Sequence, residues 1–305
     1  MSEKYRDGSP EASVRHVAAG QHGLITRSQA IGAGLTPRVI QRRTATGEWV
    51  PVHRAVYRLA GAPVTWEQRL LAATLASDGV ASHRAAARLW CLDLPEWNRA
   101  IVTVAASAYR SMRGVTVHHT RSLPRADRAV RYGIPCTSVG RTLVDLAAEL
   151  TFDDLEACVD SALRERLTTV RYLARWLPAQ GRDGTAVLRD LVADRRAHQP
   201  FGSRREAAVC RMLVAAGLPR PVPQYELRDR RGRFVARFDL AWPAWRVAVE
   251  FASYRHHFGR QAWRHDAARA NRATAEGWRI LNATEQDVDD GCRGLASDVA
   301  GARAA

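Results

Sequence analysis

The spacing of apolar residues in the first 60 positions predicts a helix-turn-helix followed by a wing. Apolar residues recur at helical intervals in three short segments, 13–19, 26–33 and 36–46. Thr26 and Thr36 are suited to N-cap positions, and Pro37 is suited to the first helical turn. A short joint with a glycine separates the second segment from the third, which is the spacing of a helix-turn-helix. The alternating residues 47–58 then predict a two-stranded wing.

The third segment carries side chains that suit a DNA groove. Arginine and glutamine bind phosphates and base edges, and the segment and the wing supply five of them: Arg38, Gln41, Arg42, Arg43 and Arg54. We therefore expect DNA contact here. The alternative is a small helical subdomain that only packs against its neighbour or mediates dimerisation.

Residues 22–61, HGLITRSQAIGAGLTPRVIQRRTATGEWVPVHRAVYRLAG, resemble the winged-helix domain of AbiEi-type antitoxins. SHRAAARLW and PCTSVGRTLVDLA further along resemble the middle segment of the same family, which is taken to be an adaptor or interaction module. The resemblance implies a DNA-binding antitoxin that regulates its own transcription in type IV toxin–antitoxin or phage-defence biology. It also implies a cognate toxin protein as a partner.

The pattern between residues 61 and 200 predicts mainly packed helices. Helices are expected at 66–77, 81–95, 134–150, 152–167, 170–177 and 185–196, with short strands at 101–104 and 115–119. His83 is expected at a helix start, partly solvated beside Arg84. His118 and His119 end a strand with no acid or thiol nearby in the sequence, so no metal site is expected there.

The pattern after residue 200 predicts an α/β core. Its elements are a helix at 204–216, a strand at 222–227, a hairpin, a helix at 262–276 and a strand at 277–284. The hairpin turns at Pro243–Arg246, so Phe238, Leu240 and Trp242 face Phe251, Val249 and Val247 on one apolar face. Asp239 then lies opposite Glu250 on the other face, and like charges there favour a cation between them.

The segments SRREAAVCRMLVAAGLPRP, ARFDLAWPAWRVAVEF, HHFG and DAARANRATAEGWRILNAT resemble the very-short-patch-repair-like branch of the PD-(D/E)xK, restriction-endonuclease-like fold. The resemblance covers about 90 residues. It implies the catalytic residues Glu206, Asp239, Glu250 and His257, with the three acids holding Mg²⁺ for phosphodiester hydrolysis. Asp266 and Arg269 match the helix beyond them, and Arg255, Arg260 and Arg264 would grip the DNA backbone.

Two departures leave the enzyme question open. The usual lysine after the second acid is replaced by Ala252, and no lysine follows Lys4. Ala252-Ser253 stands where relatives usually have Asp-Gly. An Mg-dependent DNA endonuclease in defence or repair, a nuclease fold that binds DNA without cleavage, and acids that serve only salt bridges are all compatible with the pattern. Glu206 has a further alternative role, because Ser203 and Glu206 have the spacing of a capping box.

Composition and charge favour a polyanionic partner. The formal net charge is +15, with nine basic and four acidic residues in positions 1–60, and fourteen arginines and six acids in positions 203–270. Only one of the 46 basic residues is lysine, so codon bias is an alternative source of the charge. Five scattered cysteines and the lack of an apolar leader or membrane span predict a reduced cytoplasmic protein.

The sequence therefore predicts a mixed α/β protein of three parts. These are a winged helix-turn-helix at 1–60, a middle α/β module at 61–200 and a nuclease-like α/β domain at 201–305. A third functional hypothesis is a partner-binding protein whose middle module holds a toxin.

Overall fold

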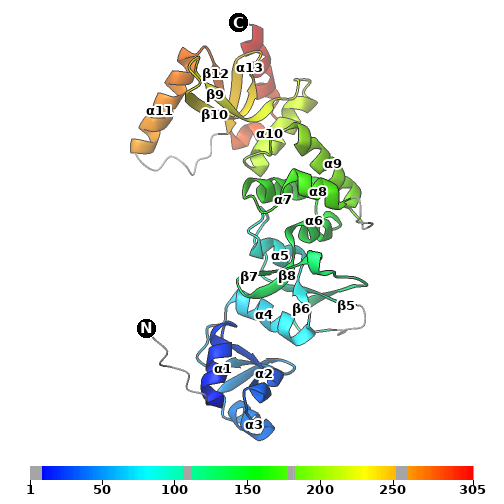
Figure 1. Cartoon of the computed structure of the whole chain (residues 1–305). Helices are drawn as coiled ribbons and strands as arrows, with labels where there is room; N and C mark the ends of the chain where they lie inside the picture. The colour runs from blue at the N-terminus through cyan, green and yellow to red at the C-terminus, as the bar shows by residue number, and fades with distance from the viewer. Residues whose placement is uncertain (1–8, 106–110, 178–180, 182, 252–259, 305) are drawn as a thin grey trace. The chain divides into compact units, whose positions relative to one another are not determined.

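The computed structural model describes residues 9–105, 111–177, 181, 183–251 and 260–304, and it has a mixed α/β fold (Figure 1). The chain forms two compact units, Met1–Leu146 and Ala147–Ala305. Their boundary falls inside the segment expected to form one middle module. Among the described residues, no helix is long and apolar enough to span a bilayer.

The first unit begins with a winged helix-turn-helix. Its elements are α1 (Pro10–Ala19), β1 (Leu24–Thr26), α2 (Arg27–Gly32), α3 (Pro37–Ala45), β2 (Trp49–His53) and β3 (Val56–Leu59). The three strands form an antiparallel sheet in the order β1-β3-β2. Ile25, Ile40 and Trp49 are buried in one cluster that joins the helices to this sheet. The expected helices and wing are confirmed, and β1 is an addition too short to leave a periodic pattern.

A second sheet follows in the same unit. Its elements are α4 (Trp66–Ser77), β4 (Val80–Ala81), α5 (His83–Leu89), β5 (Ala100–Ala105), β6 (Val115–Thr120), η1 (Arg125–Asp127), β7 (Arg128–Arg131), β8 (Ile134–Thr137) and α6 (Val139–Ala147). The strand order is β6-β5-β4-β8-β7, with β5–β6 and β4–β8 parallel. Arg141 is buried in α6, where its guanidinium binds Asp127 at 3.1 Å and Asp145 at 2.7 Å.

The second unit combines three helices with a four-stranded α/β domain. Its elements are α7 (Phe152–Arg164), α8 (Val170–Trp176), α9 (Thr185–Ala197), α10 (Arg204–Ala215), β9 (Val222–Arg228), β10 (Phe234–Trp242), β11 (Val247–Phe251), α11 (Arg260–Ala275), β12 (Arg279–Ala283), α12 (Glu285–Asp289) and α13 (Arg293–Ala304). The sheet order is β12-β11-β10-β9, and β11 and β12 are parallel. Leu213 of α10 and Val299 of α13 pack on one face of the sheet, and Ala273 of α11 packs on the other (Figure 1).

Ion pairs of two arginines join α9 to α7 and α7 to α10. The Arg195 side chain of α9 is 1% exposed, and its guanidinium binds Asp160 at 2.6 Å and Glu156 at 2.7 Å, both on α7. Arg211 of α10 pairs with the same Glu156. Helices α7–α9 are therefore structural members of the C-terminal unit.

The expected hairpin turn is confirmed, and so is the register at the three residue pairs next to it. Residues 243–246 form the turn, and Leu240, Ala241 and Trp242 pair with Val249, Ala248 and Val247. The expected apolar face is wrong at Phe238. This ring packs with Ala241 and Trp278 on the α11 side of the sheet, whereas Phe251 packs on the α10 side. On the neighbouring strand β9, Gln224 lies between the β10 partners Pro223 and Tyr225 and has a φ of 51°.

Candidate functional site

The exposed face of α3 presents basic and polar side chains on a rigid support. The Thr36 hydroxyl accepts a hydrogen bond from the Val39 amide at 3.4 Å, so α3 starts at the expected cap. Ile40 is 1% exposed and points into the winged-helix core. Arg38, Gln41 and Arg42 are exposed on the opposite side. Such a helix can contact phosphates and base edges in a major groove.

Arg43 has a different environment from its neighbour Arg42. Its side chain is 13% exposed and binds Glu11 of α1 at 3.1 Å and Glu48 at 3.8 Å. Its guanidinium carbon lies 5.4 Å from the centre of the Trp49 ring. Arg43 therefore joins α3 to α1 and β2. Arg54 is exposed in the turn between β2 and β3, where a wing can contact DNA.

Glu206 is one of the carboxylates expected in the second unit, and it is buried in the first turn of α10. Only 7% of its surface is exposed. The Ser203 hydroxyl accepts from the Glu206 amide at 3.2 Å, so Ser203 caps the helix as expected. The Glu206 carboxylate does not complete a capping box, because it accepts from the Gly202 amide at 2.8 Å. A Cβ on Gly202 would lie 2.6 Å from Gln224 Nε2 and 2.8 Å from that carboxylate, so a larger residue here would have to displace both side chains.

Asp239 lies near Glu206 through a shared amide. The Gln224 side-chain nitrogen donates to Glu206 at 2.7 Å and to Asp239 at 3.4 Å. The other Asp239 oxygen accepts from the Phe251 amide at 2.9 Å, which ties β10 to β11. Gln224 itself has a left-handed φ of 51°, so a backbone deviation accompanies this polar cluster.

Burial and a neighbouring charge shift the pKa of the Glu206 carboxyl group. Burial and, second, the negative charge of Asp239 raise its pKa to about 7. Hydrogen bonds from Gly202, Ser203 and Gln224 lower the pKa and offset part of that rise. Two close carboxylates without a cation between them commonly retain a proton, because the two negative charges repel each other.

Glu250 is neutralised by a partner on α11. The Arg269 guanidinium donates to both Glu250 oxygens, at 2.9 and 2.8 Å, and also to the Arg237 carbonyl at 3.1 Å. Among the described residues, Glu206, Asp239 and Glu250 do not form a group whose ligand oxygens all lie within 4.8 Å of one another. The three carboxylates as placed therefore do not fit the expected Mg²⁺ site, because they do not converge and the Arg269 guanidinium binds both oxygens of Glu250.

The remaining expected site residues have less structural support. Arg255 and His257 lie outside the described residues. Arg260, Arg264 and Asp266 belong to α11, but their side chains are outside the described part of the structure.

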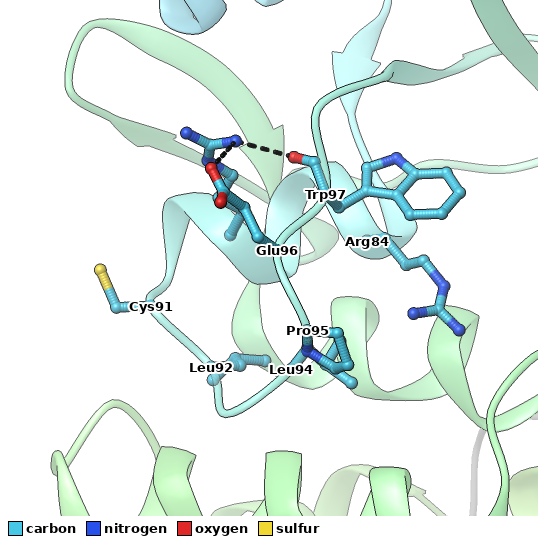
Figure 2. A pocket seen from close by; sticks show the side chains of 8 residues that line it. Arg84, Cys91, Leu92, Leu94, Pro95, Glu96 and Trp97 are labelled. Carbon is cyan, nitrogen blue, oxygen red and sulfur yellow. Dashed lines mark hydrogen bonds and ion pairs between the residues drawn. The ribbon is translucent and has the colours of Figure 1, made fainter. Parts of the chain in front are cut away.

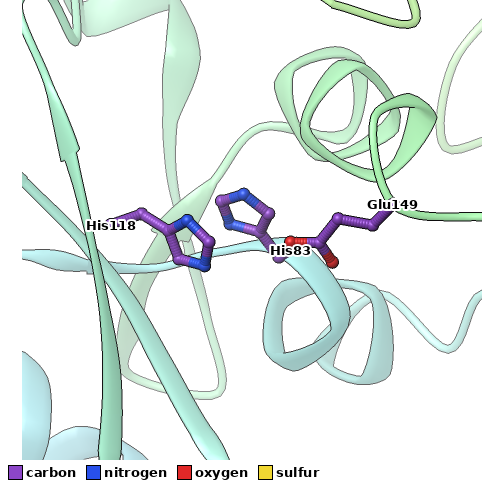
Figure 3. A group of neighbouring side chains, drawn as sticks. All are labelled: His83, His118 and Glu149. Carbon is purple, nitrogen blue, oxygen red and sulfur yellow. The ribbon is translucent and has the colours of Figure 1, made fainter.

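Two features of the first unit were missed from sequence. His83 is buried, not partly solvated, and its ring stacks on His118 with a centroid distance of 3.7 Å (Figure 3). A pocket of about 260 Å³ lies beside α5, where Arg84 stacks on Trp97 and Arg88 binds Glu96 (Figure 2). The partners are far apart in the sequence or joined by an irregular loop, so no periodic pattern connects them.

The fold and the exposed α3 face define the winged helix-turn-helix class of DNA-binding proteins. Residues 13–60 match the family model described as "Transcriptional regulator, AbiEi antitoxin". This match supports an antitoxin-type, DNA-binding interpretation of the N-terminal segment. No curated protein was found to match the chain.

Proposed function

We propose that the protein is a DNA-binding transcriptional regulator of the antitoxin type, with α3 as its recognition helix. The observation that carries the proposal is that α3 has one set of side chains exposed and another set bound to the rest of the domain. Arg38, Gln41 and Arg42 are exposed, while Ile40 and Arg43 fix the helix to the rest of the domain. A rigidly held helix with a basic exposed face suits the major groove. The family match at residues 13–60 supports the same function.

The proposed contacts divide into two kinds. Gln41 and either arginine can donate to base edges, which gives sequence preference. Arginines that bind phosphates give affinity that weakens with salt, by a slope of about 0.9 per contact. We assign Arg54 in the wing turn a contact with a phosphate, because it is exposed and lies outside the recognition helix.

Binding of the full chain to the DNA upstream of its own gene tests the proposal. Arg38→Ala combined with Arg42→Ala is expected to weaken specific binding by a hundredfold or more, given about 1–3 kcal/mol for each good base contact. The matched control is Arg171→Ala with Arg196→Ala, which removes two exposed arginines from α8 and α9. Unchanged operator affinity in the α3 double variant would rule out α3 as the recognition helix.

For the C-terminal α/β domain we propose that it binds DNA without cleaving it. The support is the set of protein donors on the three carboxylates, above all the Arg269 guanidinium on Glu250. The alternative, an Mg-dependent endonuclease, is tested by incubating the full chain with plasmid DNA and Mg²⁺ or Mn²⁺. Nicking that disappears in Asp239→Asn would establish the endonuclease and refute our proposal.

We further propose that the regulator acts in the cytoplasm on a cognate toxin, in toxin–antitoxin or phage-defence biology. The family match supports this role, since its description is that of an antitoxin. Co-expression with each neighbouring gene tests it. The expected outcome is a neighbour that arrests growth alone and is tolerated in the presence of this chain, and growth arrest by no neighbour would contradict it.

A further inference from the structure

Four arginines surround one hollow of the second unit. Its volume is about 620 Å³, and its charged lining consists of Asp229, Arg230, Arg231, Arg233, Arg246 and Glu276. These residues come from three separate turns, β9–β10, β10–β11 and α11–β12. Residues that are remote in sequence thus place four arginines and two acids around the same space.

The turn at 229–233 uses its own acid internally. Asp229 accepts from the Arg231 amide at 2.8 Å, the Arg233 amide at 2.9 Å and the Arg233 guanidinium at 2.7 Å. These bonds lower the pKa of Asp229, so the acid stays ionised and bound to the turn. Among the described residues, no hydrogen bond or ion pair involves the guanidinium of Arg230 or Arg231. The turn therefore presents two arginines that its acid does not neutralise.

Arg246 is placed by an unusual backbone conformation. Its φ is 52°, in the left-handed region that non-glycine residues seldom adopt. Its carbonyl accepts from the Arg279 amide at 2.9 Å, which fixes the turn to β12. Opposite it, Gly277 has a φ of 79°, and a Cβ there would lie 3.1 Å from Arg246 Nη1. Glycine at 277 leaves the guanidinium room to lie against this turn.

The exposure of these arginines selects the ligand. A single anion bound by solvent-exposed charges gains under about 1 kcal/mol per pair, because water and salt screen it. A polyanion gains more, because each neutralised phosphate releases condensed counterions. We propose that this hollow binds the phosphodiester backbone of nucleic acid through Arg230, Arg231 and Arg246. The site is independent of the contact proposed for α3.

The hollow is also separate from the carboxylates. Arg246 immediately precedes β11, whereas Glu250 lies near the end of that strand. Four residues of strand span roughly 13 Å. Ala275 and Gly277 mark the end of α11, and Arg269, which holds Glu250, lies in an earlier turn of that helix. Binding of a phosphodiester backbone in this hollow therefore does not involve Glu206, Asp239 or Glu250.

The experiment uses the full chain with Arg38→Ala and Arg42→Ala already present, so that contact through α3 is removed. Binding of a short random-sequence duplex is measured between about 50 and 200 mM salt. Adding Arg230→Ala, Arg231→Ala and Arg246→Ala is expected to weaken binding about tenfold or more at the lowest salt. The slope of log affinity against log salt should fall by about two to three, at 0.9 per lost contact.

Two further triple variants keep the result interpretable. Arg171→Ala, Arg196→Ala and Arg293→Ala removes the same charge from exposed positions elsewhere on the unit, and it should leave the slope unchanged. Arg230→Lys, Arg231→Lys and Arg246→Lys keeps the charge and should retain most of the binding. An unchanged slope in the alanine triple, or an equal loss in the control triple, would overturn the proposal.

Competition identifies the ligand class. The bound duplex is challenged with inorganic phosphate at constant ionic strength, and separately with polyglutamate. Retention of the duplex in both cases supports a nucleic-acid backbone site. Displacement by inorganic phosphate would show a site for single anions, and displacement by polyglutamate would show a site for acidic protein chains. Either result would overturn the assignment.

Discussion

The recognition helix and the carboxylate cluster use charged residues in opposite ways. On α3, Arg43 binds Glu11 and Glu48, and this pairing leaves Arg38 and Arg42 exposed. In the C-terminal domain the acids themselves are paired, Glu250 with Arg269, and Glu206 with Asp239 through Gln224. A charged residue can act on a partner only if the protein has not already satisfied it. The availability of each side chain therefore decides function more directly than its type.

Internal pairing is most complete at Arg195, so the largest loss of stability is expected there. Arg195→Ala leaves Glu156 and Asp160 buried without their main cation, so we expect a loss of about 3–5 kcal/mol in the free energy of unfolding of the second unit. Urea unfolding of the full chain, followed by tryptophan fluorescence, measures it. The exposed neighbour Arg196→Ala should change stability by less than about 0.5 kcal/mol. Similar values for the two variants would contradict a structural role for Arg195.

Sequence patterns could predict the hairpin and the recognition helix, because both depend on neighbours within a few residues. The register of Leu240 with Val249 follows from a two-residue repeat around a turn. The Arg195 network could not be predicted in this way, since its acids lie 35 and 39 positions away. Phe238 was misplaced because its ring packs with Trp278 on the α11 side, so the alternation of faces seen from Leu240 to Trp242 does not extend back to it. The partner of Glu250 depends on how α11 docks, which no local pattern encodes.

Glu206 is expected to make the stability of the second unit depend on pH. Its pKa rises from 4.5 to about 7 on folding, so the folded state binds the proton more tightly than the unfolded state. Stability should therefore fall as pH rises through this interval and remain lower above it, by about 3 kcal/mol. Glu206→Gln cannot ionise and should flatten this dependence. Urea unfolding at pH 5 and pH 8 measures it.

The matched control for this titration is Asp298→Asn, an exposed acid on α13. It should keep the pH dependence of the natural chain. If Glu206→Gln shows the same pH dependence as that control, Glu206 does not hold a proton near neutrality. The close approach of the Glu206 and Asp239 carboxylates would then require an explanation other than a retained proton.

Arg42 and Arg43 show the same contrast within a single helix. Arg43→Ala removes an ion pair and a contact with Trp49, so we expect the winged helix to lose about 1–2 kcal/mol of stability. Arg42→Ala should change stability by less than about 0.5 kcal/mol but weaken operator binding directly. Thermal unfolding and DNA binding, measured on both variants, separate the two roles. Equal destabilisation by the two changes would show that Arg43 has no special structural function.

The smallest expected stability effect belongs to Arg269, and it tests whether pairing keeps the carboxylate cluster from binding cations. The Arg269–Glu250 pair is partly exposed, so Arg269→Gln should cost about 1 kcal/mol or less. The same change frees the Glu250 carboxylate, and we expect Mn²⁺ binding, measured by calorimetry, to become tighter than in the natural chain. Arg272→Gln, an exposed change on the same helix, is the control. If Mn²⁺ binds the natural chain and both variants with equal affinity, Arg269 does not limit access of a cation to Glu250. The contrast between the exposed arginines of α3 and the internally paired acids would then rest on the Glu206–Asp239 pair alone.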